Sequence, residues 1–157
     1  MKLDRETEAL LFWVSSSTTK PLWQMDHKSA RDVYRRSISK TDVAPILIGA
    51  VRDFVISGPA GSVPLREYLA PKPSGAAILF FHGGGGVLGD IGTHDTLCRA
   101  LCVDTGAHVF SVDYRLAPEH PFPAQLEDSH RVYLWLIEEQ GIHPNHMVIG
   151  GESAGAG

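Results

Sequence analysis

Short, uninterrupted apolar runs alternate with longer helical patterns in the second half of the chain. The runs "AAILFF" (76–81), "HVFSVDY" (108–114) and "MVIG" (147–150) predict strands that are buried on both faces of a sheet. The segments between them, 94–105 and 122–139, predict helices. Strands that alternate with helices are joined by right-handed crossovers and run parallel. We therefore expect an α/β fold with a mostly parallel sheet.

The helical patterns also predict which faces are buried. In the second helix, side chains at helical spacing predict one buried stripe, formed by Leu126, His130, Tyr133 and Ile137. In the first helix, Cys98 and Cys102 lie four residues apart and share a face. We interpret them as small core residues and not as a redox or metal pair, because free cysteine is among the most buried residue types and the chain has no third cysteine.

The first half of the chain predicts a helical segment followed by a hairpin. Residues 2–14 and 26–39 have helical patterns, separated by the turn-rich "SSSTTKP". Residues 50–57 and 63–70 predict two strands around "GPAGS", whose glycines and proline supply the turn. Residues 1–45 therefore stand apart from the sheet-forming remainder.

Composition excludes several classes of protein. The chain has 157 residues, a size that suits one domain, and a net charge of −4. It has no basic run of the kind that follows phosphates, so we expect no nucleic-acid partner. The apolar run "ALLFWV" near the start is too short for a membrane span and wrongly flanked for a signal peptide. We expect a soluble, cytoplasmic protein.

A glycine-rich loop, "FFHGGGGVLGD", follows the strand 76–81 and has two interpretations. Gly84, Gly86 and Gly89 satisfy G-x-G-x-x-G, and Asp113 ends the next strand, as in a dinucleotide site. Against this, His82 separates the strand from the glycines, and "VLGDIGT" separates the glycines from the helix. A pyrophosphate needs a helix N-terminus at that point. A P-loop is excluded because no G-K-[ST] follows.

The last strand leads into "VIGGESAGAG", where Gly151, Ser153 and Gly155 spell G-x-S-x-G. A serine on a sharp turn after a strand has a strained backbone and an exposed hydroxyl. The small flanking residues let the chain turn tightly, and the residue after the serine donates its N–H to a developing oxyanion.

The two loops together predict more than either does alone. Ligands bind beyond the carboxyl ends of parallel strands, and both loops leave such ends. Acyl transfer needs a nucleophile and donors aimed at the oxyanion, and consecutive glycines can present consecutive N–H groups. The alternative is a flexible loop beside an ordinary small-residue turn.

With these stretches and "SVDYRLAPEHPFPAQLEDS" (111–129), the chain resembles the hormone-sensitive-lipase-like family of α/β-hydrolases. The resemblance implies that Ser153 is the nucleophile. It implies oxyanion N–H groups from Gly84, Gly85 and Ala154, and the fourth glycine leaves Gly83 open as a donor. His82 would brace the loop without transferring protons.

The resemblance also implies roles around the site. Asp113, Arg115 and Glu119 would be structural and would fix the loop after the strand. Residues 1–45 would form a helical cap over residues 46–157, the N-terminal half of the catalytic domain. Its apolar side chains could line an acyl pocket: Leu11, Phe12, Trp13, Leu22 and Trp23.

A serine needs a base and an acid that orients the base, and in this fold the order is Ser, Asp or Glu, then His. No Asp or His follows Ser153, so the triad Asp and His are not expected in this chain. Among the upstream histidines, only His120 is worth testing as a substitute. We expect the last strand to be an unsupported edge, the chain to be a truncated piece, and the isolated chain to be inactive.

The complete protein is then expected to be a serine carboxylesterase for short or medium acyl esters, with no metal or cofactor. Its partners would be the ester substrate and the remainder of the same polypeptide or a complementary chain; homodimerisation stays open. The alternatives are a small-molecule receptor of the same fold without a working base, and an inactive truncated product.

Overall fold

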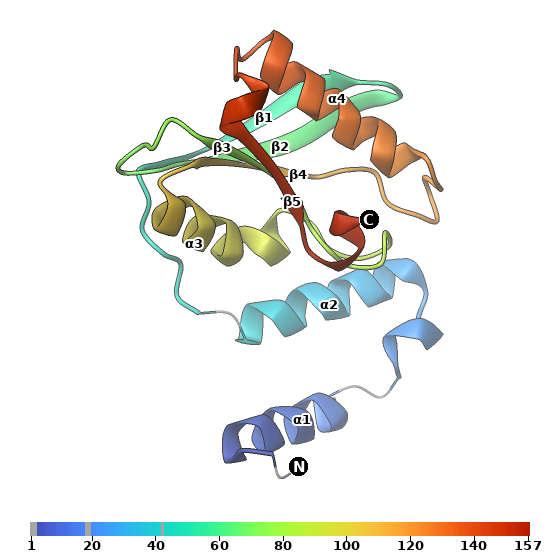
Figure 1. Ribbon diagram of the computed structural model, residues 1–157. Coiled ribbons are helices and arrows are strands. Elements are labelled where there is room, and N and C mark those ends of the chain that lie inside the picture. The colour runs from blue at the N-terminus through green and yellow to red at the C-terminus, as the bar shows by residue number, and fades with distance from the viewer. Residues whose placement is uncertain (1–2, 18–19, 42) are drawn as a thin grey trace.

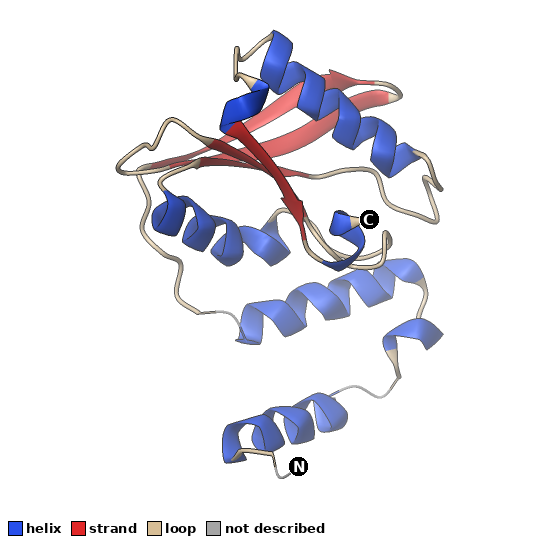
Figure 2. Cartoon of the chain, viewed as in Figure 1, coloured by secondary structure: helices blue, strands red, loops and turns tan. Residues whose placement is uncertain are grey.

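A computed structural model describes residues 3–17, 20–41 and 43–157. Within these ranges the strands form one sheet in the order β1-β2-β4-β3-β5 (Figure 1; Figure 2). The strands are β1 (Ala50–Gly58), β2 (Gly61–Leu69), β3 (Ala77–Phe81), β4 (His108–Val112) and β5 (Met147–Gly151). The α/β fold predicted from the sequence is therefore confirmed.

Strand pairing is mixed in the described sheet. The predicted hairpin is confirmed: β1 and β2 pair antiparallel and turn between Gly58 and Gly61. Strand β2 also pairs antiparallel with β4, whereas β3 pairs parallel with both β4 and β5. The expectation of a mostly parallel sheet holds only for β4, β3 and β5, because the hairpin adds two antiparallel pairings. As expected, β5 is an edge strand within the part of the chain that is described.

The helices agree with the sequence patterns to within a few residues. They are α1 (Arg5–Ser17), α2 (His27–Thr41), α3 (Asp95–Thr105) and α4 (Ala124–Glu138). Short 3₁₀ turns cover Leu22–Gln24, Gly92–His94, Pro144–His146 and Ser153–Ala156. The predicted break between the first two helices includes residues 18–19, and the predicted first helix begins at residue 2; these positions lie outside the described residues.

Alternate residues of the central strands serve two cores, one on each face of the sheet. On one face, Leu79 and Val112 pack with side chains of α4. On the other face, Phe80 and Val109 pack with Cys98 and Cys102 of α3 and, like those cysteines, are buried. Figure 1 shows α4 and α3 on opposite sides of the sheet. The interpretation of the cysteines as core residues is confirmed.

The buried face of α4 differs from the prediction. Its buried residues are Ala124, Asp128, Val132, Trp135 and Leu136. Leu126 is 56% exposed, and His130 is exposed as well. The predicted stripe was wrong at Leu126 and His130, whereas Tyr133 is partly buried and packs against the core. The apolar pattern did not include Asp128, which is 1% exposed. The Asp128 carboxylate accepts hydrogen bonds from the backbone N–H and the Nε of Arg115, both at 2.9 Å, and this pairing turns it inward.

The N-terminal helices lie on the α3 side of the sheet, with α2 between α1 and the remainder of the molecule (Figure 1). The ammonium group of Lys40 on α2 lies 5.3 Å from the centre of the Trp13 ring on α1. Of the side chains expected to line a pocket, Leu11, Phe12 and Trp23 are 52%, 74% and 82% exposed. The role of this segment as a cap stays a prediction. None of the described helices is long and apolar enough to cross a bilayer.

Candidate active site

The two glycine-containing loops begin side by side because β3 and β5 are neighbouring parallel strands. Phe81 at the end of β3 is in register with Gly151 at the end of β5. His82 and Glu152 therefore leave the sheet at the same edge and in the same direction, where open parallel sheets bind ligands. The backbone N–H of Glu152 donates to the carbonyl oxygen of Phe81 at 3.1 Å and fixes this junction.

Ser153 lies on a tight turn and has a φ of 49°, the one positive φ at a non-glycine residue in the described ranges. This left-handed conformation costs an L-residue about 1–2 kcal/mol, so the surrounding turn must hold it. The N–H of Gly155 donates to the carbonyl oxygen of Glu152 at 2.8 Å and closes the turn. A Cβ at Gly155 would lie 2.2 Å from the carbonyl oxygen of Phe81, so only glycine fits there. The Ser153 side chain is exposed.

The glycine loop folds back on itself through its carbonyl groups and leaves amides free. The N–H groups of Val87 and Leu88 donate to the carbonyl oxygen of Gly84 at 3.1 and 2.8 Å. The N–H of Gly83 donates to Nε2 of His94 at 3.4 Å. The N–H groups of Gly84 and Gly85 have no acceptor in the described parts of the chain. This arrangement favours Gly84 and Gly85 over Gly83 as oxyanion donors.

The turn around Ser153, residues 151–155, is here called the elbow. It supplies the third predicted donor and touches the glycine loop. The N–H of Ala154 also has no acceptor among the described residues. A Cβ at Gly83 would lie 1.7 Å from Oε2 of Glu152, so that carboxylate lies directly over Gly83. The two loops thus touch at Gly83 and Glu152, and each of them carries free amides close in sequence to that contact.

His82 is fully buried beneath the glycine loop. Its Nδ1 lies 2.8 Å from the carbonyl oxygen of Gly83, and its ring stacks on Tyr114 with centroids 4.3 Å apart. The Tyr114 hydroxyl donates to the carbonyl oxygen of His82. Burial lowers the pKa of His82, so the neutral ring donates to Gly83 and supports the loop. This geometry supports the bracing role expected from the sequence.

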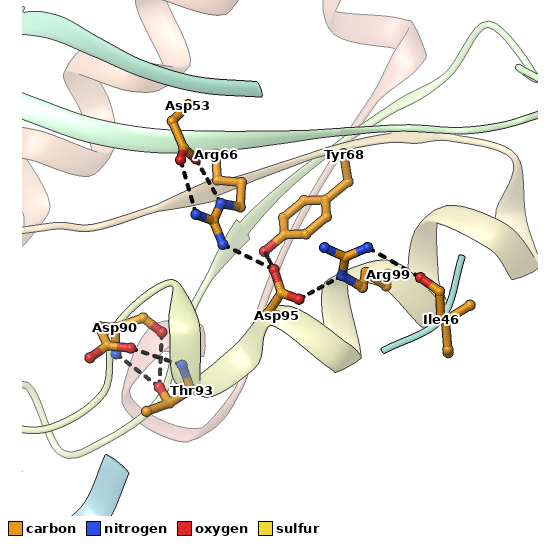
Figure 3. A network of polar contacts seen from close by, with 8 residues as sticks. All are labelled: Ile46, Asp53, Arg66, Tyr68, Asp90, Thr93, Asp95 and Arg99. Atoms are coloured by element: carbon orange, nitrogen blue, oxygen red, sulfur yellow. Dashed lines mark hydrogen bonds and ion pairs between the residues drawn. The ribbon is translucent and has the colours of Figure 1, made fainter. Parts of the chain in front are cut away.

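A polar network fixes the far end of the glycine loop (Figure 3). The backbone N–H of Thr93 donates to the Asp90 carboxylate at 2.8 Å, and the Thr93 hydroxyl accepts from the Asp90 N–H at 2.9 Å. At the start of α3, Asp95 accepts from the Tyr68 hydroxyl at 2.9 Å and from Arg66 at 3.1 Å. The Asp90–Thr93 bonds therefore close the segment between the loop and α3, and Asp95 ties the start of α3 to strand β2.

The acidic and basic residues after β4 make structural contacts. Arg115 pairs with Asp128, and its Nη2 also lies 3.1 Å from the Glu127 carboxylate. Glu119 pairs with Arg31 of α2. Asp113 is partly buried, and burial raises its pKa, with a further contribution from the nearby charge of Asp90. Sequence reasoning missed Asp128 and Arg31, because a lone charged residue in a helical pattern gives no sign of a distant partner.

The histidines do not complete a triad in the described chain. No ring nitrogen of any histidine is hydrogen-bonded to Ser153 in these ranges. His120 lies instead in a charged pocket of about 340 Å³ beneath α2, together with Arg31 and Asp113. His94 is the described histidine that reaches the elbow, with Nε2 3.6 Å from the Glu152 carboxylate.

The dinucleotide interpretation of the glycine loop loses support. Helix α3 begins at Asp95, well beyond the glycines, so no helix N-terminus faces them as a dinucleotide site requires. No group of three or more His, Cys, Asp or Glu residues in the described ranges could hold a metal.

Comparisons with known proteins point to ester hydrolases. A family described as having the alpha/beta hydrolase fold matches residues 78–157, half of the chain. The carboxylic ester hydrolase LipN of Mycobacterium tuberculosis is 43% identical over 134 residues, which are 80% of this chain and 35% of LipN. The esterase LipI of the same organism is 42% identical over 76% of this chain and 39% of LipI.

Solved structures agree with these sequence relatives. A hyperthermophilic esterase from the archaeon Pyrobaculum calidifontis superposes with a TM-score of 0.86 and 34% identity over 99% of this chain. The match covers 51% of that esterase. The chain thus spans little more than a third of the length of the two curated relatives and about half of the solved esterase.

Proposed function

Because the chain belongs to the hormone-sensitive-lipase-like family of α/β-hydrolases, we propose that it carries the nucleophile and oxyanion donors of a serine carboxylesterase. One observation carries the proposal. Ser153 has a left-handed backbone on a turn that contacts the glycine loop, and the amides of Gly84, Gly85 and Ala154 have no acceptor in the described chain. Esterase function in the relatives adds independent support.

In this proposal the Ser153 hydroxyl attacks the ester carbonyl and forms an acyl-enzyme, which water then hydrolyses. The free amides stabilise the oxyanion of both tetrahedral intermediates, and removal of one such donor typically lowers kcat by about 10²–10³-fold. The general base and its orienting acid come from outside residues 1–157, since no described histidine is bonded to Ser153. The 157-residue chain by itself is then inactive.

The pocket beside the elbow has a size and lining that suit a small acyl group. A pocket of about 380 Å³ lies between the two loops and α4, lined by Gly86, Ala154, Tyr114, Phe122 and Leu126 among others. Its apolar lining adjoins the proposed oxyanion donors, which suits an ester with a short or medium acyl chain.

The test uses the natural full-length protein with p-nitrophenyl acetate and a fluorophosphonate probe. We expect turnover and covalent labelling, both lost in Ser153→Ala. The matched control is Ser62→Ala, which removes an exposed hydroxyl from the β1–β2 hairpin and lies outside the proposed acyl pocket. Labelling that persists in Ser153→Ala would refute the proposal that Ser153 is the nucleophile. Ser153-dependent turnover by residues 1–157 alone would refute the proposal that the base comes from outside these residues.

A further inference from the structure

Arg31, on helix α2, reaches from the N-terminal helices into the base of the glycine loop. Its Nε donates to the carbonyl oxygen of Val87 at 2.7 Å, and its Nη2 donates to the carbonyl oxygen of Ala117 at 2.9 Å. These two acceptors are 56 and 86 residues away in the sequence. The side chain is only 15% exposed, so these bonds are largely shielded from water.

The two carbonyl groups belong to residues whose own N–H groups bond to the glycine loop. The N–H of Val87 donates to the carbonyl oxygen of Gly84 at 3.1 Å, and the N–H of Ala117 donates to that of Gly86 at 2.9 Å. Arg31 therefore binds two residues, Val87 and Ala117, that are themselves hydrogen-bonded to the glycine run. A shift of Val87 or Ala117 would be passed directly to Gly84 and Gly86.

The contacts require an arginine and fix its orientation. Glu119 accepts from Nη1 and Nη2 of Arg31, each at 2.8 Å, in a paired geometry. The planar guanidinium can thus serve two carbonyls and one carboxylate at once. A lysine ammonium is a point donor on a flexible stem and cannot reach all three groups in this arrangement.

The glycine run needs such support. Gly84, Gly85 and Gly86 all have positive φ, a region in which glycine moves freely and which it leaves easily. Donors that stabilise an oxyanion must be in place before charge develops, and a shift of about 1 Å can cost about 10²-fold in rate. Among the described residues, Arg31 supplies the side-chain hydrogen bond to the backbone of residues 84–88, and it comes from a separate part of the chain.

We propose that Arg31 is a positioning residue that holds the amides of Gly84 and Gly85 in the oxyanion geometry. The inference rests on the proposed function and extends it, because it couples the N-terminal helices to the rate of the chemical step. Arg31 does not touch the substrate; it acts through Val87 and Ala117.

The experiment compares Arg31→Lys and Arg31→Ala in the natural full-length protein. We expect kcat for p-nitrophenyl acetate to fall by about 10–100-fold in both variants, with KM changed by less than about threefold, because the loss falls on the transition state. Amide hydrogen exchange of residues 82–92 should rise in both. Arg131→Ala is the matched control: Arg131 also binds a carbonyl, that of Ser57, and a carboxylate, that of Glu139, but on the far side of the sheet.

Each outcome decides a separate question. Unchanged exchange in residues 82–92, or an Arg31→Lys variant with wild-type kcat and exchange, would overturn the positioning role. An equal loss in Arg131→Ala would show general destabilisation and would overturn it too. If the wild type lacks Ser153-dependent turnover, the proposed function fails, whereas hydrogen exchange still decides whether Arg31 holds the loop.

Discussion

Alanine at Gly84 should damage the glycine loop far more than alanine at the adjacent Gly85. A Cβ at Gly84 would lie 2.2 Å from the carbonyl oxygen and 2.4 Å from the carbonyl carbon of Leu88. Ordinary contact begins at 3.4 Å, so the Leu88 carbonyl would have to retreat by 1.2 Å, the difference between these distances. That movement opens the turn in which the Leu88 N–H binds the Gly84 carbonyl oxygen.

The magnitudes separate the two variants. Gly84 has a φ of 122°, and forcing alanine into such a region costs about 1–3 kcal/mol. The overlap with Leu88 adds about 1–3 kcal/mol, as overpacking does elsewhere. A Cβ at Gly85 meets no heavy atom within 4 Å, so Gly85→Ala carries only the left-handed strain of about 1–2 kcal/mol.

Urea unfolding of the full-length protein measures both variants. We expect Gly84→Ala to lose about 2–6 kcal/mol of unfolding free energy, and Gly85→Ala about 1–2 kcal/mol. The unfolding free energy is compared, and not the activity, because Gly84 and Gly85 are both proposed oxyanion donors. Equal losses in the two variants, or a greater loss in Gly85→Ala, would refute the loop geometry.

Three further results are expected. Burial raises the pKa of Cys98 to about 12, so its thiol should resist iodoacetamide at about pH 8 until the protein unfolds; labelling of the native thiol, read by mass spectrometry, would contradict this. Hydrogen bonds from Arg31 lower the pKa of Glu119 from 4.5 to about 2, so their pairing is complete above the ordinary value and is lost as pH falls toward 2. Hydrogen-exchange protection factors in α2, which correct for the intrinsic exchange rate at each pH, should fall over that window, and constant protection factors would argue against the pairing. Tyr68→Phe removes a buried donor to the Asp95 carboxylate and should lower the unfolding free energy by about 1.5–3 kcal/mol in urea; a loss below about 0.5 kcal/mol would show that this bond contributes little.

Local patterns predicted most of the fold. Apolar runs located β3, β4 and β5, and the glycines around Pro59 located the hairpin, because strand burial and turn chemistry are set by nearby residues. The face of α4 could not be predicted in this way. Asp128 is buried only because Arg115 reaches it from another segment, and a helical pattern carries no information about such a partner.

The site shows the same division. The sequence placed Ser153 and the glycine run at the carboxyl ends of two parallel strands, since the elbow motif and the strand–helix alternation are local signals. That these two strands are neighbours was learned from the strand order. The sequence could not decide between Gly83 and Gly85 as a donor, because that depends on His94, which accepts the Gly83 N–H. It also missed Arg31. Two of its acceptors are backbone carbonyls, which every residue has, so the sequence gives no sign of which residues Arg31 contacts.

The most direct test of the account is a crystal structure of the natural full-length protein after reaction with a fluorophosphonate. The phosphorus should be bonded to Oγ of Ser153, with its phosphoryl oxygen about 2.7–3.1 Å from the backbone nitrogens of Gly84, Gly85 and Ala154. An adduct on another residue, or a phosphoryl oxygen turned away from those nitrogens, would contradict it.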